Sequence, residues 1–219
     1  MVKVESAEAT FKSMLKPSAD KDWFAAADAR DNWKDIGTYW GLNHMTEVYL
    51  SQRLTEEFLG RGRERYVVMP IQEACNLVNS DEKFREMARW NFLHTKELIL
   101  ESGLVIPYPR VKTYEGHLEY VADVKIDGGE LKPHPSDVIK VELDTNDVVK
   151  TLVKAGIMKE PKNKFTSAGI KFESYLNPGV SVPSFSWDNN NECITVSTCE
   201  PSCTSSEVQR TVFKKVTYS

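Results

Sequence analysis

Apolar residues recur every three or four positions through the first hundred residues, which is the spacing of one face of an α-helix. The pattern predicts helices over residues 18–35 and 43–59, and a shorter helix that opens at Pro70. A fourth and longest helix is predicted from a cap at Ser80 to a C-terminal Gly103. This part of the chain is therefore expected to be mainly helical.

After Gly103 the pattern changes to alternation and to short apolar runs between turn residues. The segments predicted as strands are rich in β-branched and aromatic residues: 118–126, 182–187, 193–198 and 208–218. Residues 136–143 fit a short helix and a strand equally well. The tail is expected to end in a β-hairpin.

A capped helix, a basic turn and a second helix are predicted over residues 144–176. Asp144 or Thr145 can cap the first helix, and Gly156 supplies the left-handed exit that an apolar strand residue follows. A proline-bearing turn then returns through a strand at Phe165. Thr166, the next residue, caps the second helix.

Two short motifs in this stretch resemble the winged-helix domains of bacterial regulators. They are Ala155-Gly156-Ile157-Met158 after the first helix and Thr166-Ser167-Ala168-Gly169 after the basic turn. The resemblance implies a recognition helix, a wing and a trailing helix. It also implies a binding platform, because such units contact DNA or dock on proteins.

The expected fold class is therefore α+β, a helical N-terminal half followed by a winged-helix-like unit and a C-terminal β-hairpin. The expected domains are a mainly helical one over residues 1–103 and a mixed α/β region over 104–219. The mixed region would contain the winged-helix-like unit at 136–176 and the terminal hairpin at 182–218.

Lysines supply the DNA contacts that the resemblance implies: Lys150, Lys154, Lys159, Lys162 and Lys164. Asp144 and Asp147 stand at the start of the same helix and would repel phosphates. Residues 144–176 contain six Lys against two Asp and two Glu, a local charge of +2. That balance suits a wing that touches phosphates, and it suits a protein-docking scaffold equally.

Three arginines form another candidate anion contact: Arg61, Arg63 and Arg65. Glycines beside them would leave the guanidinium groups exposed. The alternative is that they complement the C-terminal dipole of the helix before them.

Charge and hydropathy restrict the partners. The net charge of −4 and the pI of about 5.7 provide no general basic field for nucleic acid, so any DNA contact must be local. No apolar run of 18 or more residues exists, so no membrane-spanning helix is expected. The N-terminus lacks the apolar core of a signal peptide, although a fragment or a processed chain would look the same.

Four cysteines are present, and three of them follow one another closely: Cys193, Cys199 and Cys203. Their spacing differs from paired Cys-x-x-Cys zinc knuckles. A disulfide between Cys199 and Cys203 would indicate an extracytoplasmic protein, whereas free thiols fit the cytoplasm. No metal and no cofactor is expected.

Catalytic signals are few. His44-x-x-Glu47 and His94-x-x-Glu97 each place an imidazole and a carboxylate on one helical face, and two such pairs could converge on a metal. Pairs at this spacing are also ordinary surface features. A dyad of Cys75 with a histidine is a further alternative.

The predicted function is therefore non-enzymatic binding, by a DNA-contacting regulator or accessory factor. The alternative is a protein-interaction or structural component of an envelope, a virion or a secreted assembly, without nucleic-acid binding. Either role predicts a protein partner or a homo-oligomer.

Overall fold

The computed structural model describes the following residues: 33–38, 43–56, 64–89, 92–115, 117–121, 124–127, 130–133, 138–172, 178–201 and 209–217. Every structural statement below concerns these residues. The first predicted helix lies outside them, apart from its last three positions.

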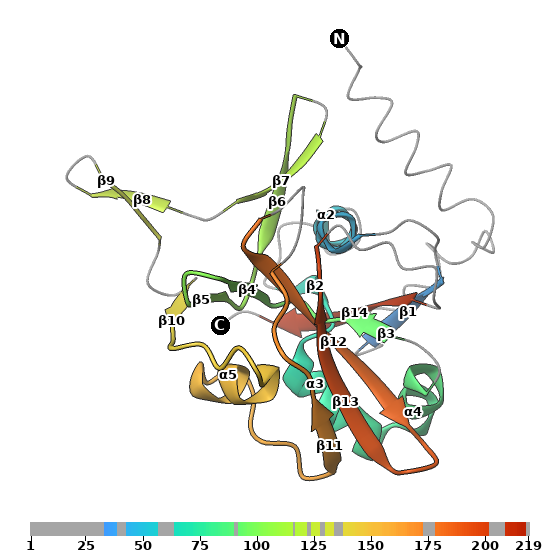
Figure 1. Cartoon of the computed structure of the whole chain (residues 1–219). Helices are drawn as coiled ribbons and strands as arrows, with labels where there is room; N and C mark the ends of the chain where they lie inside the picture. Colours follow the sequence, from blue (N-terminus) through green and yellow to red (C-terminus); the bar gives the residue numbers. More distant parts are fainter. Residues whose placement is uncertain are drawn as a thin grey trace.

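A ten-stranded sheet forms the centre of the fold (Figure 1). Its strands, in chain order, are β1 (Trp33–Thr38), β2 (Glu64–Val68), β3 (Phe92–His94), β4 (Leu98–Leu100), β5 (Leu104–Ile106), β10 (Ile139–Lys140), β11 (Lys164–Ser167), β12 (Val180–Asp188), β13 (Cys193–Cys199) and β14 (Gln209–Thr217). The path β1-β14-β3-β12-β4-β5-β10 runs across the sheet. Off this path, β2 pairs with β14, β13 pairs with β12, and β11 pairs with β13.

Strands β12 and β14 hold the sheet together. β12 forms an antiparallel hairpin with β13 and pairs at its other edge with both β3 and β4. β14 pairs with β1, β2 and β3. Strands from both sides of residue 103 therefore alternate within one sheet.

Two short hairpins extend away from the main sheet (Figure 1). β6 (Arg110–Tyr114) pairs with β7 (His117–Val121), and β8 (Val124–Asp127) pairs with β9 (Glu130–Pro133). Only the first of these hairpins carries a residue of the site described below.

The helices of the described residues are α2 (His44–Leu54), α3 (Ile71–Ser80), α4 (Glu82–Ala88) and α5 (Val148–Lys154). The apolar faces of α3, α4 and α5 contribute to one large core that includes Phe84, Leu152 and Phe185, all fully buried. α2 belongs to a smaller core around Val48 and Phe213. None of these helices is both long enough and apolar enough to cross a membrane.

The expected helical N-terminal half is wrong. Trp33–Thr38, assigned in part to the first predicted helix, forms strand β1 and pairs with β14. Glu64–Val68 forms β2 on the other edge of β14. Most of the fold before residue 107 that is not α2, α3 or α4 is sheet, so the protein is mixed α/β.

The longest predicted helix is the clearest error. A helix does begin there, with Asp81 rather than Ser80 as its cap, but α4 ends at Ala88. The exposed fractions of Leu93, Leu98 and Ile99 are 1% or less. Neighbouring strands lie on both sides of these residues and core residues cover both faces. An apolar run buried on both faces has the same composition in a strand and in a helix, so the helical interpretation failed.

Residues 144–176 match the winged-helix pattern only at their start. α5 forms, but its cap is Asp147 and not the predicted Asp144 or Thr145. Gly156 adopts a φ of 68°, as predicted for the exit. Ile157 starts no strand, and β11 pairs in parallel with β13 instead of forming a wing hairpin. Residues 168–172 are irregular, and the remainder of the predicted second helix lies outside the described residues.

Other local predictions are confirmed. α3 begins directly after Pro70 and buries Ile71, Ala74, Leu77 and Val78. The strands predicted in the tail are β12, β13 and β14. Asp188 closes the turn of the β12–β13 hairpin by accepting the backbone N–H groups of Asn190 and Asn191.

Candidate active site

Helix α2 places two acid–base side chains on its buried side. The helix begins at Asn43, whose side-chain oxygen accepts the backbone N–H of Thr46 at 2.9 Å. His44 and Glu47 follow three positions apart and therefore share one face of the first turn. Both side chains are completely buried. A buried imidazole and a buried carboxylate need polar partners, which other elements supply.

The partner of Glu47 is His94, the last residue of β3. His94 Nδ1 lies 2.8 Å from Glu47 Oε2, and the two side chains are 4% and 1% exposed. A carboxylate only accepts, so Nδ1 carries the proton of this bond. Burial alone lowers the pKa of His94, but Glu47 and Cys199 outweigh it and raise that pKa well above its usual value.

Cys199 is the third member of this group. It is the last residue of β13, and its free, partly exposed thiol is close enough to His94 to raise the pKa of that imidazole. The thiol itself donates to the carbonyl oxygen of Val182, 3.8 Å from Sγ. Nδ1 of His94 donates its N–H to Glu47. Nε2 is therefore the ring nitrogen that can take the thiol proton. Glu47, His94 and Cys199 thus form a carboxylate–imidazole–thiol series, the arrangement that activates a nucleophilic cysteine.

His44 connects the segments that carry these residues. Its backbone N–H donates to the carbonyl oxygen of Pro201 at 3.1 Å, two positions after Cys199. Its ring Nε2 lies 2.9 Å from the carbonyl oxygen of Thr95, the residue after His94. The two imidazole rings meet edge to face, with centroids 5.9 Å apart.

Tyr120 binds the remaining nitrogen of His44. The Tyr120 hydroxyl lies 2.8 Å from His44 Nδ1. Burial and the adjacent His94 lower the pKa of His44 to about 3, against the opposing bond to Thr95, so the ring is neutral. A neutral imidazole has one N–H, which the Thr95 carbonyl accepts. Nδ1 is therefore an acceptor, and Tyr120 must be the donor.

The β6–β7 hairpin presents Tyr120 to the site, and α2 holds the hairpin in place. The side chain of Gln52 donates to the carbonyl oxygen of Val111 and accepts its N–H, both at 2.8 Å. Val111 is buried in the smaller core, and Leu118 and Tyr120 pack against it. Burial and the acidic groups nearby raise the pKa of Tyr120, so the phenol stays protonated.

Glu97 lies outside this group although its spacing pairs it with His94. Its carboxylate accepts the backbone N–H of Ile71 at 3.3 and 3.4 Å. Pro70 gives α3 no side-chain cap, so Glu97 caps that helix from another element. Among the residues that the structure describes, no three His, Cys, Asp or Glu side chains converge as metal ligands.

The other thiols are placed differently. Cys75 and Cys193 are buried and free. Burial and the neighbouring Glu97 raise the pKa of Cys75 to about 12, which makes it a poor nucleophile at neutral pH. Cys203, the predicted disulfide partner of Cys199, lies outside the described residues.

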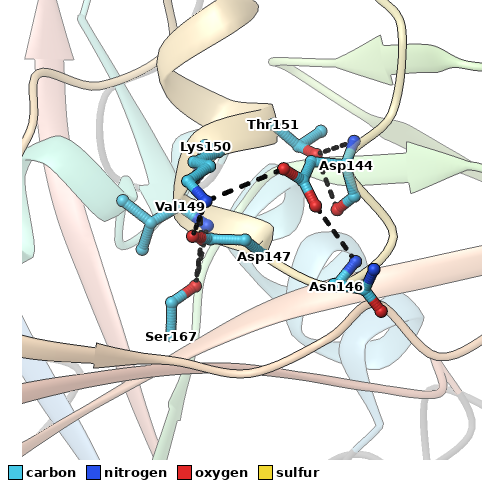
Figure 2. A network of polar contacts seen from close by, with 7 residues as sticks. All are labelled: Asp144, Asn146, Asp147, Val149, Lys150, Thr151 and Ser167. Carbon is cyan, nitrogen blue, oxygen red and sulfur yellow. Dashed lines mark hydrogen bonds and ion pairs between the residues drawn. The ribbon is translucent and has the colours of Figure 1, made fainter.

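The lysines predicted to contact DNA are all exposed: Lys150, Lys154, Lys159, Lys162 and Lys164. Figure 2 shows that Lys150 faces two aspartates, its Nζ lying 3.3 Å from Asp147 and 4.0 Å from Asp144. Asp147 also accepts the Lys150 N–H and the Ser167 hydroxyl. The helix start that was expected to read DNA is thus internally paired.

Of the arginines predicted as an anion contact, Arg65 is exposed on β2. Arg61 and Arg63 lie outside the described residues.

Comparison of the chain with protein-family models, with curated proteins and with solved structures found no match.

Sequence reasoning found part of this site and assembled it wrongly. His44, Glu47 and His94 were noted as members of helical pairs, but Glu47 pairs with His94 across 47 positions. The sequence leaves Cys199 either in a disulfide with Cys203 or as a free thiol, and neither alternative connects it with His94. Tyr120 was not singled out, because a tyrosine in an alternating strand carries no local sign of a buried partner.

Proposed function

We propose that this protein is an enzyme that transfers or hydrolyses acyl groups through a covalent thioester on Cys199. The observation that carries the proposal is the position of His94, whose imidazole is hydrogen-bonded to Glu47 at 2.8 Å and whose pKa is raised by both Glu47 and the thiol of Cys199. This function differs from the non-enzymatic binding that the sequence predicts.

The roles follow from the protonation of His94. Glu47 accepts the Nδ1 proton, holds the ring orientation and stabilises the imidazolium. Because the pKa of His94 is raised, Nε2 already holds the proton that the thiol gives up, and the thiolate of Cys199 attacks the carbonyl carbon of an ester, thioester or amide. The imidazolium then protonates the leaving group, and the acyl group remains on the sulfur. Water, deprotonated by His94, releases the acid and restores the thiol.

The test uses an activated ester, p-nitrophenyl acetate, with the full chain. We expect a burst of p-nitrophenol and an acetyl group on Cys199, located by mass spectrometry. His94→Gln should lower the acylation rate at pH 7 by about 100-fold, because general-base catalysis contributes at least that much. Cys199→Ala should abolish it.

Cys193 provides the matched control, since it lies on the same strand six residues earlier. Cys193→Ala should acylate at the wild-type rate. An acetyl group that appears on Cys75 or Cys193 as readily as on Cys199, or a rate that His94→Gln leaves unchanged, would refute the proposal.

A second candidate function is contact with DNA phosphates through the lysines at the end of α5 and after it. Lys154, Lys159, Lys162 and Lys164 are exposed, and Glu160 is the only acid between residues 154 and 171. This local charge supports a salt-sensitive anion contact.

Fluorescence-anisotropy titration with random duplex DNA tests the second candidate. Affinity that falls steeply with salt and is lost on reversing the charge of Lys159, Lys162 and Lys164 supports it. Lys150→Ala, which removes a lysine already paired with aspartates, is the control and should bind as the wild type does. Absence of binding at low salt would leave protein docking as the role of this surface.

A further inference from the structure

We infer that His44 is the positioning residue of this site and that Tyr120 sets its tautomer, which makes the β6–β7 hairpin part of the catalytic machinery. The inference rests on the proposed function of Cys199 and extends it to residues that do not touch the substrate.

The first step is connectivity. The nucleophile, the base and the orienting acid come from three separated segments, namely β13, β3 and α2. His44 bonds to two of these segments at once, through Pro201 after Cys199 and Thr95 after His94. It belongs itself to the third, one turn before Glu47. A single residue thus links all three segments, through its backbone N–H to the segment after β13 and through its imidazole to the segment after β3.

The second step is proton direction. Nε2 of His44 must donate, because the Thr95 carbonyl can only accept. If the proton moved to Nδ1, the ring would face that carbonyl with a lone pair and the connection would be lost. The Tyr120 hydroxyl donates to Nδ1 and therefore holds the useful tautomer.

The third step is the anchor of Tyr120. Gln52 lies two turns beyond His44 on α2. Its side chain holds the hairpin by two hydrogen bonds, one to the backbone carbonyl oxygen of Val111 and one from the backbone N–H of Val111. The hairpin and the helix are therefore joined at two points, and displacement of the hairpin would carry the Tyr120 hydroxyl away from the imidazole.

The test compares three variants by the acylation rate of Cys199 with p-nitrophenyl acetate. His44→Leu should lose about tenfold or more, because both ring contacts disappear. His44→Gln should stay within about threefold of the wild type, since its amide can donate to Thr95 and accept from Tyr120. Tyr120→Phe, which preserves the ring, should lose about tenfold. Tyr108→Phe, which removes a hydroxyl from a half-exposed ring, is the control and should lose nothing.

Long-range ¹H–¹⁵N spectra of the imidazoles provide a readout that simple loss of stability would not move. We expect the wild-type His44 proton on Nε2 and a mixture of tautomers in Tyr120→Phe. Near-UV circular dichroism identifies any variant that fails to fold. If His44→Leu fails to fold, the acylation rate of Tyr120→Phe decides the test in its place.

The outcomes separate the two proposals. Wild-type acylation that does not depend on His94 would overturn both of them. His94-dependent acylation that a folded His44→Leu and Tyr120→Phe both retain in full would overturn the positioning role alone. A proton on Nδ1 of His44 in the wild type would overturn the tautomer assignment directly.

Discussion

His94 and Glu47 form a buried imidazole–carboxylate pair whose closest atoms, Nδ1 and Oε2, lie 2.8 Å apart. The chain contains an exposed counterpart, His117 and Glu119, with Nε2 and Oε1 3.0 Å apart and side chains 57% and 40% exposed. Water screens the exposed pair, so its contribution is small. The buried pair is far less screened, and its carboxylate raises the pKa of the His94 imidazole.

Glu47→Gln should lower the pKa of His94, because the carboxylate is the main group that raises it against burial. The measurement is an NMR titration of the His94 ring in the variant and in the wild type. Glu119→Gln is the matched control and should leave that titration unchanged. An unaltered His94 titration in Glu47→Gln would show that another group holds the charge.

Stability should fall in mild acid because of His44. Burial, followed by His94, lowers its folded pKa to about 3, whereas the unfolded chain has the ordinary value of 6.5. Between pH 3 and pH 6.5, His44 therefore binds a proton in the unfolded state but not in the folded state. The stabilisation is complete above pH 6.5 and is lost as the pH falls toward 3, at up to about 1.4 kcal/mol per pH unit. His94, with a raised pKa, contributes no slope in this window, since it is protonated in both states.

Urea unfolding at pH 7, 6, 5 and 4 measures this effect. We expect the difference in unfolding free energy between the wild type and His44→Gln to change steadily over the series, because the variant lacks the titrating ring. Parallel curves for the two proteins would contradict the assignment of His44 as a neutral buried imidazole.

Gly103 should not tolerate a side chain. Its φ is 83°, and a Cβ built there would lie 2.6 Å from the carbonyl oxygen of Val141. Gly103→Ala should therefore destabilise the protein by roughly 3 kcal/mol, from the left-handed backbone and the clash together. Gly156, with a φ of 68° and no atom within 4 Å of a built Cβ, is the control, and Gly156→Ala should cost only about 1 kcal/mol. Equal losses in urea unfolding would show that the contact with Val141 relaxes.

Asp147→Ala should destabilise the protein by about 1 kcal/mol through loss of the α5 cap. Asp147 accepts the Lys150 N–H and the Ser167 hydroxyl, so its removal leaves both donors without this acceptor (Figure 2). Asn146→Ala changes an exposed side chain next to the cap and should cost less than about 0.5 kcal/mol. Thermal unfolding of the two variants makes the comparison, and an equal shift would show that the cap is dispensable.

Local signals were sufficient for several elements. Pro70 followed by apolar residues at helical spacing predicted the start of α3, and Gly156 predicted a left-handed helix exit. The polar turn after Trp187 predicted the hairpin of β12 and β13. In each case the deciding interaction joins residues within one turn or one hairpin, so it is visible in the order of the side chains.

The candidate site could not be predicted in the same way. His44, Glu47 and His94 carried a recognisable pairing signal, but helical spacing assigned each histidine to the wrong carboxylate. His94 is on a strand, where the residue three positions later points elsewhere, and Glu97 caps α3 instead. Cys199 reaches His94 only because β12 pairs with β13 on one edge and with β3 on the other.

By itself the sequence determined the start of α3 at Pro70, the left-handed exit at Gly156 and the hairpin turn after Trp187, since these depend on neighbouring residues and on backbone conformation. Only the tertiary structure decided that residues 92–94 and 98–100 are strands and that four polar side chains from α2, β3 and β13 belong to one site: His44, Glu47, His94 and Cys199. The physical reason is that strand pairing and the burial of charge depend on partners far along the chain. Short-range periodicity carries no information about such partners.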